Sequence, residues 1–145
     1  MSRVRASAAL ADSIFHAEEL WYDTARWPSF VPGFGRVVSV DADWPRGGSI
    51  TWDSRPGGRG RVIEDVTWFS PREGQDARVE DAEITGTQRL RFAPGRVSLE
   101  VEYRLKEGNV VRDLLLVRRR MHRVVRTTVR RFAIELTADR ELHVR

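Results

Sequence analysis

The clearest pattern along the chain is a strict alternation of apolar and polar residues in segment 96–106, RVSLEVEYRLK. Its apolar positions are Val97, Leu99, Val101, Tyr103 and Leu105. Successive side chains of a β-strand point to opposite faces of the sheet. The alternation therefore predicts a strand with one buried face and one solvated face, which is typical of antiparallel sheets.

Five further short runs between residues 35 and 92 are rich in β-branched and aromatic residues. They cover residues 35–41, 48–54, 60–69, 78–85 and 87–92. Turn sequences such as WPRGG, RPGGRG and SPREGQD separate most of these runs. Short strands with regular turn signals between them predict an antiparallel meander. Residues 3–10, RVRASAAL, predict a first strand ahead of this meander.

Segment 12–31 predicts a short helical region. Either Asp12 or Ser13 can cap its first turn, because both side chains accept hydrogen bonds from free backbone N–H groups. Its apolar face consists of Ile14, Ala17 and Trp21. We expect Pro28 and Pro32 to break the region into short pieces.

Residues 113–142 carry apolar side chains at intervals of three and four. The stripe consists of Leu114, Val117, Met121, Val124, Val125, Thr128, Phe132 and Leu136. This spacing predicts one long amphipathic helix. Asp113 lies at its expected start, where the helix dipole favours an acid. Seven arginines lie between residues 117 and 132, mostly away from the stripe.

The predicted order is a strand, a short helical segment, six strands and a long helix. An α+β fold satisfies it, with a curved antiparallel sheet wrapped around the C-terminal helix, so that the helix stripe and the inner sheet face bury each other. At 145 residues, with no linker or repeat, we expect residues 1–145 to form a single domain.

Composition excludes several kinds of site. The chain has no cysteine, so disulfides, thiolate metal sites and cysteine nucleophiles are excluded. Three scattered histidines lack metal-ligand spacing, and we expect no metal. The N-terminal segment lacks the apolar core of a signal peptide, and no run approaches a membrane span, so we expect a soluble cytoplasmic protein.

The formal net charge of +4 is a weak indication of anionic partners. Lys106 is the only lysine, and a genomic codon bias explains the preference for arginine. Because the long helix must bury its apolar stripe, we expect its arginines to form a solvent face. No nucleic-acid-binding motif is present, so we expect no specific nucleic acid partner. Peripheral contact with an anionic membrane is an open alternative.

Two segments resemble the START/Bet v 1-like (SRPBCC) superfamily, and within it the bacterial polyketide cyclase/dehydrase-type proteins. Residues 19–41, ELWYDTARWPSFVPGFGRVVSVD, resemble a helix that ends in Asp, an aromatic–proline break and the second strand. Residues 114–136, LLLVRRRMHRVVRTTVRRFAIEL, are similar to the closing helix of that family. The resemblance implies a helix-grip fold with a cavity between sheet and helix that binds apolar or amphipathic small molecules.

We expect apolar and aromatic residues to line such a cavity. The candidate ligand-binding residues are Trp27, Phe30, Trp52, Trp68, Phe92, Tyr103, Met121, Val125 and Thr128. For any single aromatic residue, packing in the core is the more common role. Arg55, Arg59 and Arg61 are weaker candidates for holding an acidic headgroup at the cavity mouth.

The resemblance carries no universal catalytic motif, so the catalytic candidates Glu64, Arg91 and His122 rest on position alone. Glu64 shares a predicted strand face with Trp68 and would point inward with it, partnered by Arg89 or Arg91. The alternative is a pair on the outer face of the sheet. His122 would be a proton shuttle near neutral pH or an ordinary helix histidine.

Three functions remain open from the sequence. The first is binding of a small hydrophobic or amphipathic molecule, such as a polyketide, a fatty acyl chain or another lipid. The second is a polyketide aromatase/cyclase-like enzyme that acts mainly by positioning its substrate. The third is an anionic partner held by the arginines of the long helix. None needs a cofactor, and we expect none; a monomer and a homodimer are both compatible.

Overall fold

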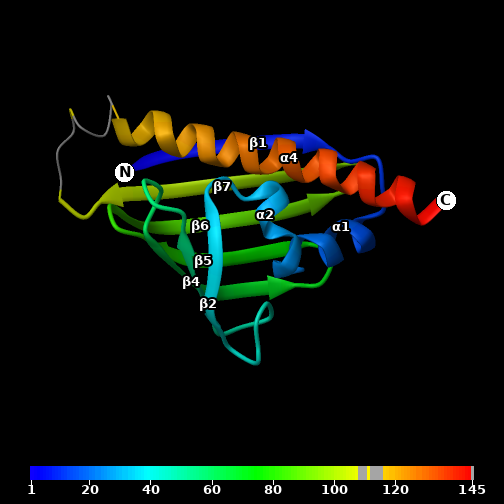
Figure 1. Ribbon diagram of the computed structural model, residues 1–145, viewed down its shortest axis with the longest axis horizontal. Helices are drawn as coiled ribbons and strands as arrows, with labels where there is room; N and C mark the ends of the chain where they lie inside the picture. Colours follow the sequence, from blue (N-terminus) through cyan, green and yellow to red (C-terminus); the bar gives the residue numbers. More distant parts are fainter. Residues whose placement is uncertain (108–110, 112–115, 145) are drawn as a thin grey trace.

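The computed structural model describes residues 1–107, 111 and 116–144, and within them seven antiparallel strands form one sheet (Figure 1). The strands are β1 (Ser2–Ala9), β2 (Phe34–Val40), β3 (Ser49–Ser54), β4 (Arg61–Ser70), β5 (Gly74–Glu80), β6 (Ile84–Ala93) and β7 (Arg96–Leu105). Their order in the sheet is β1-β7-β6-β5-β4-β3-β2. An antiparallel meander of six strands is confirmed, although one of them, β5, lies partly outside its predicted position, and β1 extends the meander beside β7.

Helices cover the inner face of the sheet (Figure 1). They are α1 (Ile14–Trp21), the 3-10 helix η1 (Thr24–Arg26), α2 (Trp27–Phe30) and the long α4 (Arg118–Val144). The helix α4 packs against β1, β7 and α2. This arrangement is a helix-grip α+β fold, as predicted. The expected helix start at Asp113 and the stripe residue Leu114 lie outside the described residues.

The helical region after β1 is broken at Tyr22 and Asp23 rather than at the first proline. Ser13 caps α1, because its hydroxyl accepts a hydrogen bond from the backbone N–H of His16. Pro28 lies in the first turn of α2. Proline has no backbone N–H, but no hydrogen bond is lost at this position, because the first N–H groups of a helix have no partner within it. The proline therefore begins a helix, contrary to our expectation for Pro28.

The sequence predicted one strand over residues 78–85. In the structure these residues form the end of β5, a turn and the start of β6. The turn is closed by Asp81, whose Oδ1 accepts hydrogen bonds from the backbone N–H groups of Glu83 (2.8 Å) and Ile84 (2.9 Å). Asp commonly closes turns in this way. The β-branched residues on either side of Asp81 hid this turn in the sequence pattern.

The core lies between the inner face of the sheet and the helices. The alternation along β7 is confirmed, with Val97, Leu99, Val101 and Tyr103 buried. On α4 the buried residues are Met121, Val125, Thr128, Val129, Phe132, Leu136 and Asp139, and Val117 is buried just before its start. Val129 is an addition to the predicted stripe, and Val124 is only half-buried. Rings from α1, α2 and α4 meet at Phe132, whose ring centroid lies 4.9 Å from that of Trp21 and 5.2 Å from that of Phe30.

An ionic cluster joins α1 and η1 to the C-terminal half of α4. The imidazole of His16 lies between two carboxylates, with Nδ1 2.5 Å from Asp12 and Nε2 2.7 Å from Asp139. Arg26 donates to Asp139 (3.0 Å) and to Glu135 (2.5 Å). Burial disfavours the charged imidazole, but the hydrogen bonds and charges of Asp12 and Asp139 outweigh it and raise the pKa of His16.

This raised pKa predicts how stability depends on pH. The contribution of His16 is fully present below its ordinary pKa of about 6.5 and is lost as the pH rises through the higher pKa of the folded state. We expect the free energy of unfolding to fall over that interval and His16→Gln to remove this fall. Urea denaturation at a series of pH values measures it. His122→Gln is the matched control, and an unchanged slope in His16→Gln would contradict the assignment.

Candidate ligand-binding cavity

A cavity of about 40 Å³ lies between the sheet, α2 and the middle of α4. A water molecule needs roughly 10–15 Å³ of such volume, so the cavity has room for about three waters. Its walls come from α1, α2, residues 31–32, the inner face of the sheet and α4. The position, between the sheet and the closing helix, is the one that the resemblance implied.

Most of the wall is apolar. Trp27 and Trp52 meet edge to face, with ring centroids 6.4 Å apart. The indole N–H of Trp27 donates to the carbonyl of Trp21 at 2.8 Å, so its polar atom is satisfied away from the cavity. On α4, Thr128 likewise donates its hydroxyl to the carbonyl of Val124 (2.7 Å). The helix and α2 therefore contribute an apolar and aromatic surface.

The opposite wall carries a buried carboxyl group on β4. Oε2 of Glu64 accepts a hydrogen bond from Nε1 of Trp52 at 2.9 Å, and Oε1 accepts from Nε2 of Gln88 at 3.2 Å. Burial raises the pKa of Glu64, and the Trp52 hydrogen bond, the charge of Arg59 and the Gln88 hydrogen bond offset this only in part. Glu64 therefore keeps its proton at pH values where an exposed glutamate has lost it.

A guanidinium group completes the polar wall. Arg59, in the loop between β3 and β4, donates from Nε to Oδ2 of Asp81 at 2.9 Å. Its side chain is only 10% exposed, and the side chain of Asp81 is fully buried. The Arg59 guanidinium also lies over the ring of Trp52, 5.9 Å from its centroid. The carboxylate of Asp81 and the aromatic face of Trp52 together hold the cation at the edge of the cavity.

The structure separates the predicted site residues into two groups. Those that line the cavity are Trp27, Phe30, Trp52, Glu64, Met121, Val125 and Thr128. Their role in binding stays a prediction. Phe92 and Tyr103 are buried in the core but do not line the cavity. His122 is exposed on α4, beside several arginines. Of the three hairpin arginines, only Arg59 reaches the cavity, and Arg61 pairs with Asp53 on the surface.

Trp68 and Arg91 lie on the outer face of the sheet, contrary to the sequence prediction. Trp68 is 39% exposed, and the guanidinium of Arg91 lies 4.5 Å from its ring centroid. The cause is a bulge in β4 between Val66 and Trp68. A bulge adds one residue to a strand and reverses the faces beyond it. Glu64 therefore points inward while Trp68 points outward.

The expected partners of Glu64 were also wrong. Arg91 pairs with Asp76 at 2.7 Å, and Arg89 lies near Glu100 and Glu102 on the outer face. The true partner Gln88 is a neighbour of Arg89 on β6, one position away and on the other face. A single-residue change in register exchanges the two faces of a strand, so the sequence alone did not identify Gln88.

Two further features, a metal-binding group and a helix able to cross a membrane, are absent from the described residues. No group of three or more His, Asp or Glu residues among them has the arrangement of a metal site. Among the described helices, none is both long enough and apolar enough to cross a membrane.

The structure is a helix-grip α+β fold with a cavity between its sheet and its long helix. The fold agrees with the helix-grip fold that the resemblance implied. Neither protein-family models nor curated protein sequences match this chain. Solved structures match it over nearly its whole length.

Three of these solved structures illustrate the match. Protein TTHA0849 of Thermus thermophilus has 19% identity and a TM-score of 0.66, covering 95% of this chain and 99% of its own. The polyketide cyclase-like protein Cgl2372 of Corynebacterium glutamicum has 16% identity and a TM-score of 0.56, covering 97% and 94%. DynU16, from the dynemicin biosynthetic locus, has 17% identity and a TM-score of 0.60, covering 94% of this chain and 48% of its own.

The environment of Glu64 predicts a second dependence of stability on pH. Because its pKa is raised, the contribution of Glu64 is fully present below the ordinary value of 4.5 and falls as the pH rises from there towards the folded pKa. We expect Glu64→Gln to flatten the stability profile in this range and to stabilise the fold at neutral pH. Thermal unfolding at a series of pH values from the acid range to neutral measures both effects. Glu73→Gln, at an exposed turn residue, is the control, and equal profiles for the two variants would contradict the prediction.

Proposed function

We propose that the protein binds a small amphipathic molecule, with its apolar part against α2 and α4 and its polar end against Glu64, Gln88 and Arg59. The observation that supports this most is the buried polar wall within an otherwise aromatic cavity. A carboxyl group and a guanidinium are expensive to bury, and a solid apolar core would form without them. A few convergent polar groups in an apolar cavity are typical of ligand sites.

The chemistry of this wall indicates the kind of polar group that fits. A protonated Glu64 has one O–H to donate, and Arg59 has N–H groups beyond the one that Asp81 accepts. Both therefore favour an oxygen acceptor, such as the carbonyl of a ketone, an ester or an acid. Polyketides and acyl chains combine such oxygens with apolar carbon. The similarity in fold to a polyketide cyclase-like protein supports the same class.

The size of the cavity sets a condition on binding. Its volume is about 40 Å³, whereas pockets for drug-sized ligands measure about 300–1,000 Å³. A polyketide or acyl chain therefore requires part of the wall to move outward. The four-residue α2 is the smallest wall element, and it is followed by Gly33 with a φ of +69°. Outward movement of α2 would enlarge the cavity.

Native mass spectrometry of protein purified gently from its own host tests the binding function. We expect a small-molecule adduct at one per chain, and its loss in Val125→Trp, which fills the cavity. Val38→Trp, on the exposed surface of β2, is the matched control and keeps the adduct. Val124→Trp replaces Val125→Trp if the latter does not fold.

Titration with fatty acids of increasing chain length gives a second readout. We expect saturable 1:1 changes in tryptophan fluorescence, since Trp27 and Trp52 line the cavity. Absence of both an adduct and a saturable fluorescence change would overturn the proposed function.

A second candidate function is suggested by the raised pKa of Glu64. A carboxyl group whose pKa is raised by burial keeps its proton to a higher pH than an exposed glutamate, and a carboxylic acid beside a bound substrate is suited to general acid catalysis. In a β-hydroxy ketone, Glu64 would donate this proton to the departing hydroxyl, which leaves as water. In the same step the Glu64 carboxylate so formed would take the proton from the α-carbon, and the electrons of that C–H bond would form the new C=C bond. Arg59 would polarise the ketone oxygen, and Glu64 would be returned to its acid form. This is the dehydration step of an aromatase/cyclase-like enzyme.

Turnover of a β-hydroxy ketone thioester, followed by absorbance of the conjugated product, tests this candidate. We expect Glu64→Gln to lower kcat by about 10²-fold or more, the usual contribution of a general acid, while ligand affinity is retained. Arg91→Ala and His122→Ala are controls, because both residues lie outside the cavity. Unchanged turnover in Glu64→Gln, or no turnover in the unchanged protein, would remove the enzyme from consideration.

A further inference from the structure

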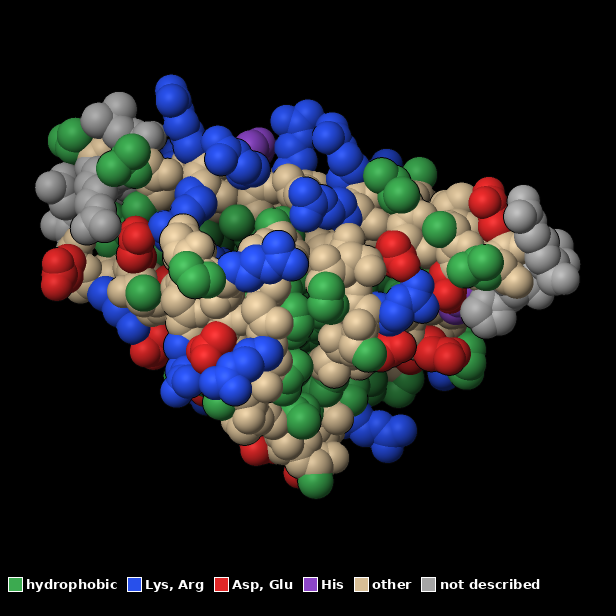
Figure 2. Space-filling model, in the orientation of Figure 1, with side chains coloured by type: hydrophobic (Ala, Val, Ile, Leu, Met, Phe, Trp, Pro, Cys, Tyr) green, Lys and Arg blue, Asp and Glu red, His purple; other side chains and the backbone are tan. Residues whose placement is uncertain are grey.

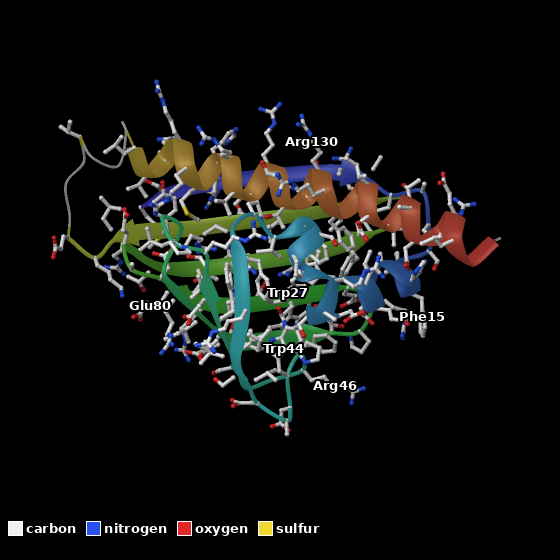
Figure 3. All side chains as sticks on the ribbon, viewed as in Figure 1. Phe15, Trp27, Trp44, Arg46, Glu80 and Arg130 are labelled. Carbon is white, nitrogen blue, oxygen red and sulfur yellow. The ribbon has the colours of Figure 1, made fainter. Side chains whose placement is uncertain are left out.

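The outward side of α4 presents a row of exposed arginines, with the aliphatic Leu116 two residues before the start of the helix at one end and Ile134 at the other. The arginines are Arg119, Arg123, Arg126 and Arg130, here named the arginine ridge. Their spacing of three and four residues places them along one side of the helix. Figure 2 shows basic side chains gathered along the edge formed by α4, and Figure 3 shows Arg130 pointing away from the sheet.

The ridge carries charge that the described part of the protein does not neutralise. None of its four arginines takes part in an ion pair among the described residues, whereas Arg120, on another side of α4, pairs with Glu83 at 2.9 Å. Segment 116–134 contains no Asp or Glu. Its seven arginines exceed the formal net charge of +4, so the rest of the chain has a net charge of −3. The positive character of the protein therefore resides on this helix.

The two ends of the ridge are apolar. Leu116 is 65% exposed and Ile134 is 63% exposed. They lie 18 residues apart, which is about 27 Å along the helix at 1.5 Å per residue. Both fall on the same side of the helix as the arginines, about five turns apart. The row thus has the composition of a surface that meets both phosphate groups and hydrocarbon.

We propose that the arginine ridge docks the protein on an anionic lipid surface. The guanidinium groups bind lipid phosphates, and Leu116 and Ile134 enter the boundary between headgroups and acyl chains. The apolar stripe of α4 is occupied by the core, so the helix lies on the membrane without inserting its buried face. Lipid is favoured over nucleic acid because the ridge has no aromatic side chain for base stacking, and because nucleic acid leaves both aliphatic residues in water.

The docking surface and the cavity share one helix. Met121 and Val125 line the cavity on the buried side of α4, while Arg119, Arg123 and Arg126 face outward. Docking therefore places the cavity about one helix diameter, roughly 10 Å, from the lipid surface. Membrane docking is a property separate from the proposed ligand binding. Different experiments measure the two, so a negative result for one does not overturn the other.

Vesicle flotation tests the docking directly. We expect binding to vesicles of phosphatidylcholine mixed with phosphatidylglycerol, little binding to phosphatidylcholine alone, and release by added salt. Each arginine near an anionic surface contributes about 1 kcal/mol, or about fivefold in partitioning, so Arg123→Gln with Arg126→Gln should weaken binding about 30-fold. The matched control is Arg46→Gln with Arg78→Gln, two exposed arginines away from α4. Equal effects of the two double variants would overturn the proposal.

The aliphatic ends distinguish a lipid surface from other anions. We expect Leu116→Ser with Ile134→Ser to weaken vesicle binding several-fold although no charge changes. Fluorescence anisotropy with duplex DNA and single-stranded RNA at the same ionic strength provides the comparison. Tighter binding to either nucleic acid than to the anionic vesicles would overturn the lipid assignment, as would vesicle binding that the serine variants leave unchanged.

Discussion

Burial of the apolar stripe of α4 against the sheet and α2 is the interaction on which the rest of the structure depends. The stripe changes in bulk along the helix. Near its C-terminal half, the ring of Phe132 packs against the rings of Trp21 and Phe30. One to two turns earlier, Val125 and Thr128 are smaller and leave the cavity. The position of the cavity thus follows from where large side chains give way to small ones, and the arginines face outward because the stripe faces inward.

Local periodicity predicted the elements whose pattern is uninterrupted. The alternation along β7 and the three-and-four spacing along α4 each extend over many residues, so one exception does not obscure them. The turn at Asp81 and the bulge after Val66 are single-residue events within β-rich sequence, and periodicity cannot reveal them. The bulge mattered most for the site, because it separated the inward Glu64 from the outward Trp68.

The polar wall of the cavity illustrates what sequence reasoning could not reach. Glu64 depends on Trp52 from β3, on Gln88 from β6 and on Arg59 from a loop, and Arg59 depends in turn on Asp81. The hydrogen bonds of this wall join residues that lie 12 to 24 positions apart. Nothing in the sequence marks Gln88 as different from other strand glutamines, since only the sheet register brings it beside Glu64. The sequence made Glu64 a candidate, but it did not predict the residues that surround Glu64.

Charge is divided along α4, and this division bears on how the cavity can open. The acids of the helix lie in its C-terminal part, where Glu135 and Asp139 hold Arg26 of η1 and Asp139 also holds His16. These ion pairs fix the chain immediately before α2, whereas the segment after α2 leads to Gly33 with its positive φ. Because α2 is held at its start and followed by a permissive glycine, we propose that the cavity opens by outward movement of its C-terminal end, which separates Phe30 from Phe132. Such a movement would carry Phe30 and Val31 off the cavity while the ion pairs and the outward face of α4 stay in place.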